Sequence, residues 1–230
     1  MSNDNQDADR AERGHYRFTV NGVSYQSNDA ELSGRDVLRI AGFNPASDHV
    51  LIQVARPGTH SVGIDDPLDL STPGKEEFWA FASDRTFNFT VDELGYEWGA
   101  ATISDTELRV ITGASDDQDF KLERTDEPDR IIGEGESVNL DARGTEHLRI
   151  VKASVTIIVN AEERKVTGRR ITFEQLVILA FETPPTGPNI LITIDYGKGP
   201  LQNPKGSLEA GQSVKIKNRM VFDVTATDRS

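Results

Sequence analysis

Apolar positions along the chain form a pattern that occurs three times. A short strand of alternating apolar residues ends at Val20, Val91 and Val159, which are separated by 71 and 68 positions. An apolar run at helical spacing follows each strand, and a further apolar strand begins at each of three positions spaced 70 apart, namely Val50, Phe120 and Ile190. Because these landmarks recur in the same order, the sequence predicts three divergent repeats of about 70 residues.

Turn and cap residues predict the elements inside each repeat. Asn21-Gly22 is a strong signal for a two-residue hairpin, and Asn160-Ala161 stands at the same place in the third repeat as a weaker turn. A residue typical of helix N-caps then precedes the helical run in each repeat: Ser33, Ser104 and Thr172. A polar loop and a closing strand, at 77–82, 147–151 and 220–225, complete the unit.

The resulting order is ββαββ, an α+β unit with one helix packed on a mixed sheet. We expect a polar tail at 1–15 and domains at 16–84, 85–152 and 153–230. Helical spacing places six residues against the sheet: Val37, Ile40, Leu108, Ile111, Leu176 and Leu179. Strand alternation places Val50, Ile52 and Val54 toward the helix, as well as Phe120, Leu122, Ile190, Ile192 and Ile194.

Composition narrows the functions that this chain can have. The formal net charge of −13 disfavours nucleic-acid binding, because an acidic surface repels phosphates. The absence of cysteine excludes thiolate metal sites and a cysteine nucleophile. The four histidines have no metal-binding spacing, and no phosphate-binding or nucleophile motif occurs. The longest apolar stretch, 176–181, is too short to span a membrane. We expect a cytoplasmic, non-enzymatic protein without a cofactor.

The charge is distributed unevenly among the repeats. Residues 85–152 carry 8 basic and 16 acidic side chains, whereas residues 153–230 carry 10 and 8. Neutral sequence drift at charged, solvent-exposed positions explains such a difference in charge. The alternative is electrostatic contact of the third repeat with an acidic repeat of another copy, which would associate copies head to tail, or with a partner enzyme.

The ββαββ unit with an Asn-Gly first hairpin and a capped helix resembles the ubiquitin β-grasp fold. Three tandem copies behind an acidic, polar segment resemble the bacterial multiubiquitin family. That resemblance implies a protein modifier, or a substrate, of a conjugation pathway. Its implied partners are ubiquitin-activating-like and ubiquitin-conjugating-like enzymes and a JAB-type metallopeptidase. It also implies a docking patch on the outward face of the third sheet strand, where Leu51 and Leu191 stand.

The chain departs from ubiquitin at its carboxyl end. Ubiquitin-like modifiers close with two glycines, whereas residues 225–230 and both repeat junctions contain none. We therefore expect no cleavage into single domains. Conjugation or processing would use a mobile tail from Ala226 that includes Thr227, Asp228, Arg229 and Ser230. The alternative function is a non-covalent scaffold or self-assembling protein built of β-grasp repeats.

Overall fold

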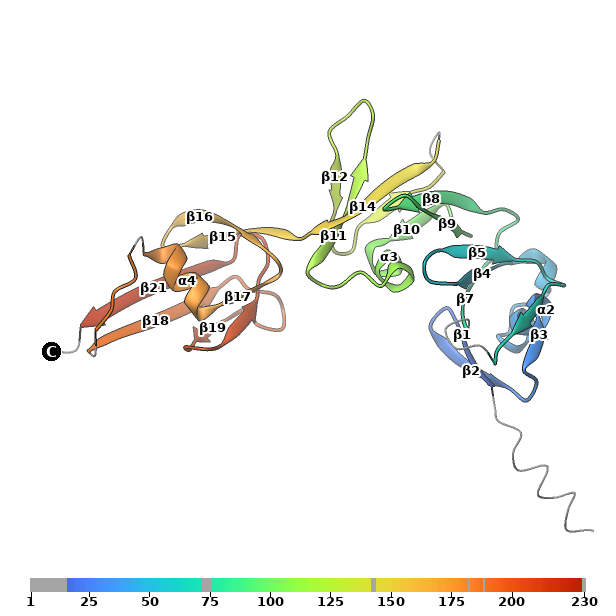
Figure 1. The fold of residues 1–230 in the computed structure, drawn as a ribbon, viewed down its shortest axis with the longest axis horizontal. Helices are drawn as coiled ribbons and strands as arrows, with labels where there is room; N and C mark the ends of the chain where they lie inside the picture. The colour runs from blue at the N-terminus through green and yellow to red at the C-terminus, as the bar shows by residue number, and fades with distance from the viewer. Residues whose placement is uncertain (1–15, 72–75, 142–143, 182, 188, 229–230) are drawn as a thin grey trace, which may run out of the picture. The chain divides into compact units, whose positions relative to one another are not determined.

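A computed structural model describes residues 16–71, 76–141, 144–181, 183–187 and 189–228. The expected tail at 1–15 lies outside the described residues. Contacts divide the chain into two compact units (Figure 1). The first unit holds the first two repeats, and the second holds the third repeat together with Ser115–Asp119.

Each repeat builds a five-stranded mixed sheet with the same strand order. The three orders are β2-β1-β7-β4-β5, β9-β8-β14-β11-β12 and β16-β15-β21-β18-β19. In each, the first and last strands of the repeat run parallel at the centre of the sheet. A short two-stranded pair lies apart from each sheet: β3·β6, β10·β13 and β17·β20. This confirms the α+β class with β-grasp topology.

The strand and helix bounds are as follows. The first repeat contains β1 (Tyr16–Val20), β2 (Val23–Ser27), β3 (Glu31–Ser33), α2 (Gly34–Ile40), the 3₁₀ turn η1 (Ala46–Asp48), β4 (Val50–Val54), β5 (Thr59–Val62), β6 (Pro67–Asp69) and β7 (Glu77–Phe81). The second contains β8 (Phe87–Val91), β9 (Leu94–Trp98), β10 (Thr102–Ser104), α3 (Asp105–Thr112), β11 (Gln118–Glu123), β12 (Arg130–Ile132), β13 (Ser137–Asn139) and β14 (Glu146–Lys152). The third contains β15 (Ser154–Val159), β16 (Glu162–Thr167), β17 (Arg170–Thr172), α4 (Phe173–Ala180), β18 (Ile190–Gly197), β19 (Lys205–Leu208), β20 (Ser213–Lys215) and β21 (Val221–Asp228). The segment expected to be a loop before each closing strand therefore contains an additional sheet strand, β5, β12 or β19.

All three first hairpins turn through two residues with positive φ, as a type I′ turn requires. The side chain of the first turn residue then reaches the last strand of the same repeat. Asn160 donates from Nδ2 to the Val224 carbonyl (3.0 Å) and accepts the Val224 N–H at Oδ1 (2.8 Å). Asn21 makes the same pair of bonds with Ala80, and Asp92 accepts the Ile150 N–H (3.2 Å). The side chain thus extends the central parallel ladder.

The three N-caps predicted from the sequence are confirmed. Ser33, Ser104 and Thr172 each accept a backbone hydrogen bond from the third helical residue, whose side chain accepts from the cap backbone in return. The left-handed Gly113 ends α3. These bonds satisfy backbone donors that a short helix otherwise leaves without partners, so each helix begins at a fixed residue.

Each repeat has a separate apolar core between its helix and one sheet face. In Figure 1, α4 lies across β18 and β21 in this way. Four of the six predicted helix positions are fully buried: Val37, Leu108, Ile111 and Leu176. The other two, Ile40 and Leu179, are only half-buried, and Leu38 and Val177 supply the additional buried contacts.

The predicted register of the third sheet strand is wrong in the first repeat. The strand pairs Leu51↔Val62, Phe120↔Ile132 and Ile194↔Leu208 mark equivalent positions. Leu51 therefore faces the helix and lies in the first core, whereas Val54 lies in the core of the second repeat. Successive strand residues face opposite sides, so this displacement by one residue reverses the face of the whole strand. The predicted inward residues of β11, and Ile192 and Ile194 of β18, are confirmed.

Replacing Leu176 with Ala should lower the free energy of unfolding of the third repeat by about 2–5 kcal/mol, because the side chain is fully buried in its core. Chemical denaturation followed by NMR signals from the third repeat measures this loss. The matched control is Ile178→Ala on the same helix, where the side chain is 66% exposed and the expected change is below about 0.5 kcal/mol. Similar losses for both variants would contradict the assigned helix face.

Replacing Asn160 with Gly should cost about 1–3 kcal/mol, because it removes both side-chain bonds to Val224. Glycine adopts the positive φ of this position without strain, so the loss reports the hydrogen bonds. Ala161→Gly, at the next turn position, should keep stability or raise it by up to about 1 kcal/mol. Thermal unfolding measures the stability of both variants against that of the unaltered chain. Equal stability of Asn160→Gly and the unaltered chain would show that the bonds contribute nothing.

Candidate functional site

The carboxyl-terminal strand is longer than the sequence predicted. β21 pairs with β18 along eight residues on each strand, from Val221↔Gly197 to Asp228↔Ile190. The expected mobile tail is therefore wrong for Ala226, Thr227 and Asp228, which pair with Ile192, Leu191 and Ile190. Arg229 and Ser230 lie outside the described residues. Four of the eight residues of β21 are β-branched, which favours such an extended strand: Val221, Val224, Thr225 and Thr227.

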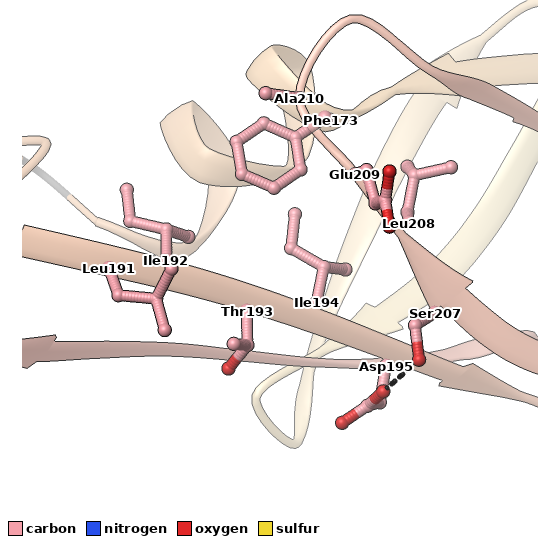
Figure 2. Close-up of a pocket in the computed structure, with 10 residues that line it drawn as sticks. All are labelled: Phe173, Leu191, Ile192, Thr193, Ile194, Asp195, Ser207, Leu208, Glu209 and Ala210. Carbon is pink, nitrogen blue, oxygen red and sulfur yellow. Dashed lines mark hydrogen bonds between the residues drawn. The ribbon is translucent and has the colours of Figure 1, made fainter.

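A pocket of about 530 Å³ lies on the helix side of β18 (Figure 2). Figure 2 shows Ile192 and Ile194 directed toward the Phe173 ring, while Thr193 and Asp195 project from the opposite face of the strand. Leu208, Glu209 and Ala210 close the side beyond β19. The Ser207 hydroxyl donates to Asp195 Oδ1 (2.6 Å). The pocket is mainly apolar with a carboxylate-bearing rim, a combination that suits a partner's side chain.

Phe173 explains why the loop after β19 leaves room for this pocket. It is the first residue of α4, and the equivalent first residue of α2 is Gly34. A Cβ atom at Gly34 would lie 2.5 Å from the Gly63 carbonyl oxygen, so the corresponding loop of the first repeat packs directly on the helix start. In the third repeat a large ring occupies this position, although the Phe173 N–H still donates to Gln212 (3.1 Å).

The two residues of the expected docking patch are placed differently. Leu191 is half-exposed on β18, consistent with a surface position. Leu51 is 1% exposed and belongs to the core of the first repeat, so its assignment to a surface patch is wrong. The physical reason is the register of β4 described above. The expected common patch on repeats one and three therefore does not exist in that form.

The outward face of the second repeat, opposite its helix, carries paired charges. Lys121 donates from Nζ to Asp129 (2.8 Å), which raises the pKa of Lys121 and lowers the pKa of Asp129. Arg149 contacts Glu123 (2.6 Å) on the next strand. These exposed pairs keep the face polar and contribute little to stability. They make this face a poor site for an apolar contact.

Sequence reasoning missed the junction of the first and second repeats. β5 pairs in parallel with β9 at Thr59↔Tyr96, which joins the two sheets into one of ten strands. The Thr59 hydroxyl donates to the Glu97 carbonyl (2.6 Å), and the Glu97 carboxylate accepts the Ser61 N–H (2.6 Å). The edges of the two repeats thus satisfy each other's backbone groups.

Aromatic side chains cover the outward face of the first repeat at this junction. Trp98 of the second repeat lies 4.7 Å from Phe81 and 5.1 Å from Trp79 between ring centroids. The sequence held a signal for this cover: four of the five residues of β4 (VLIQV) are apolar, and a nearly continuous apolar strand indicates burial on both faces.

Among the described residues no group of His, Cys, Asp or Glu side chains is arranged to hold a metal ion. In the same part of the chain, no helix is long and apolar enough to cross a membrane. The surface features described in this subsection are the β18·β21 ribbon and the pocket beside β18.

Three repeated mixed sheets, each crossed by one capped helix and closed by a central parallel strand pair, define a tandem ubiquitin-like β-grasp protein. The multiubiquitin family model matches residues 16–83, 87–152 and 155–228, so the chain belongs to the multiubiquitin family. No curated protein and no solved structure matches the chain.

Replacing Val54 with Glu should separate the first two repeats, because it places a carboxylate in the core of the second repeat. Glu is the residue that β11 carries at the equivalent position, Glu123. We expect each repeat to retain its own fold but to tumble independently, as measured by ¹⁵N relaxation.

The control is Thr193→Glu, which adds the same charge at an exposed strand position of the third repeat. It should leave the relaxation of the first two repeats unchanged. A Val54→Glu chain whose first two repeats still tumble as one body would contradict the role assigned to this contact.

Proposed function

We propose that this chain is a ubiquitin-like protein modifier that partner enzymes activate or process at its carboxyl end. The observation that carries the proposal is the β18·β21 ribbon within a multiubiquitin repeat. Its eight-residue ladder fixes the direction in which the chain leaves the third domain after Asp228. A rigid domain with a defined exit point lets an enzyme bind the fold and reach the following residues.

The junction of the second and third repeats supports use of the repeats as one chain. β14 ends at Lys152 and β15 begins at Ser154, so Ala153 alone separates the strands. Ala153 is fully buried, and its N–H donates to Asp117 (2.9 Å). Proteases prefer exposed, extended segments, so this junction resists cleavage into single domains.

The partners in this proposal are a ubiquitin-activating-like enzyme, a ubiquitin-conjugating-like enzyme and a JAB-type metallopeptidase. Residues 225–230 contain no glycine, so an activating enzyme that acts on these residues needs a channel that accepts side chains. Arg229 adds a positive charge that favours an acidic channel or nucleotide phosphates.

A non-covalent scaffold is the second candidate, and one observation favours it. The first two repeats already associate edge to edge through β5 and β9, without any covalent transfer. Contact of the same kind between chains, aided by the basic third repeat, would give head-to-tail assembly.

Incubation of the full chain with its activating-like enzyme, ATP and magnesium tests the first proposal. We expect intact mass spectrometry to detect an adduct on the chain. Deletion of Arg229 and Ser230 should reduce the adduct and leave every described residue pair between β21 and β18 in place. Deletion from Thr227 also removes two pairs, Thr227↔Leu191 and Asp228↔Ile190.

The sharpest control is the same chain with a carboxyl-terminal amide, which blocks the carboxylate and leaves the sequence unchanged. An adduct that persists on the amidated chain would contradict activation at the carboxyl end. If no adduct forms and light scattering shows salt-sensitive assembly, the scaffold is the correct function.

A further inference from the structure

β18 is paired unequally on its two sides. Its residues Ile190–Gly197 all pair with β21, but β19 covers only Ile194–Gly197. No described strand lies against the other edge of Ile190–Thr193. The Ile190 N–H donates to Gly187 (3.3 Å) rather than to β21, so alternation directs the N–H and C=O of Ile192 toward the open edge.

The first repeat lacks this open edge. There β5 pairs with Leu51–Val54, which leaves only Val50 of β4 beyond the ladder. The open edge of β18 is about 13 Å long, enough for a four-residue strand. Exposed backbone edges of this kind readily accept an added strand.

The pocket of Figure 2 lies beside this edge. Ile192, which directs its backbone toward the edge, also directs its side chain toward Phe173 in the pocket. A strand added along Ile190–Thr193 would place alternate side chains on the helix side, where Phe173, Ile194 and Leu208 offer apolar contact. Together we call the edge and the pocket the β18 slot.

The chain itself shows that a strand on this side of a repeat sheet accepts an added strand. β5 occupies the sheet position of β19, and its outer edge is extended by β9 of the next repeat. That contact combines backbone pairing with apolar side chains, Trp98 against Phe81 and Trp79. The β18 slot offers the same two components without an occupant among the described residues.

The negative charge at the rim of the β18 slot indicates a segment with basic residues as its occupant. Asp195 and Glu209 line the slot, and neither has a described salt bridge to a basic side chain. Glu174 accepts the Gly211 N–H (2.8 Å) at the adjoining helix start. Basic residues flanking an apolar side chain would complement this rim.

We propose that the β18 slot binds an extended peptide segment of a partner protein. The segment adds a strand along Ile190–Thr193 and places one large aliphatic or aromatic side chain under Phe173. It sets one lysine or arginine near Glu209 on the helix side and another near Asp195 on the opposite face of β18. This docking requires no conjugation chemistry, so its failure and that of the proposed modifier function are distinguishable.

The probe is a displayed library of random eight-residue peptides, selected against the immobilised full chain. We expect enrichment of sequences with a central aliphatic or aromatic residue and basic flanks. An enriched peptide should slow amide exchange at Ile192. Ala210→Trp, which fills the pocket from an exposed loop position, should weaken that peptide roughly tenfold or more.

The matched control is Ala101→Trp, the same change at an exposed position of the second repeat, which should leave peptide affinity unchanged. Methylation of the peptide's backbone nitrogens should abolish binding by removing strand pairing. Any of four results would overturn the proposal: no enrichment, equal binding to the Ala210→Trp chain, equal binding of the methylated peptide, or a dimer of the unaltered chain that Ala210→Trp converts to monomer.

Discussion

The bond from the first hairpin turn to the last strand joins the two ends of each repeat. Asn21, Asp92 and Asn160 lie 58 to 64 positions before the residues whose backbone they bind. A contact over this separation carries a loop-closure cost that local elements cannot offset alone. By extending the central parallel ladder, the turn side chain fixes the sheet on which the helix packs. The core, the outer strands and both sheet faces follow from that placement.

Once the sheets are fixed, their edges and outward faces decide which repeats act together. The first repeat has apolar residues on both faces of β4, and its outward face needs cover, which the second repeat supplies through Trp98. At the positions equivalent to Ile52 and Val54, the second repeat carries Lys121 and Glu123. Burying these charges against an apolar neighbour would cost desolvation energy, so they disfavour such a contact. Two equivalent strand positions therefore decide whether a repeat's outward face packs against the next domain, as in the first repeat, or stays polar, as in the second.

The repeats, the hairpin at Asn21 and the three capped helices could be predicted because their signals are local. A cap acts through its own third helical residue, and a type I′ turn through two adjacent residues. The register of β4 could not be predicted from VLIQV, since alternation carries no information when both faces are buried. The end of β21 escaped prediction because its pairing with Ile190 and Leu191 depends on a strand about 36 positions earlier. The pocket under Phe173 likewise depends on a loop distant in sequence.

These constraints are the reason why both proposals use the third repeat as the surface for a partner. The first repeat's outward face is covered, and the second repeat's outward face holds exposed ion pairs that an apolar partner would have to desolvate. The third repeat combines a partly open strand edge, an apolar pocket and the exit of the chain after Asp228 on the same two strands, β18 and β21. An enzyme acting on the residues after Asp228 would meet this ribbon first. In the proposed modifier function, one ladder would therefore couple recognition of the fold to access to the residues after Asp228.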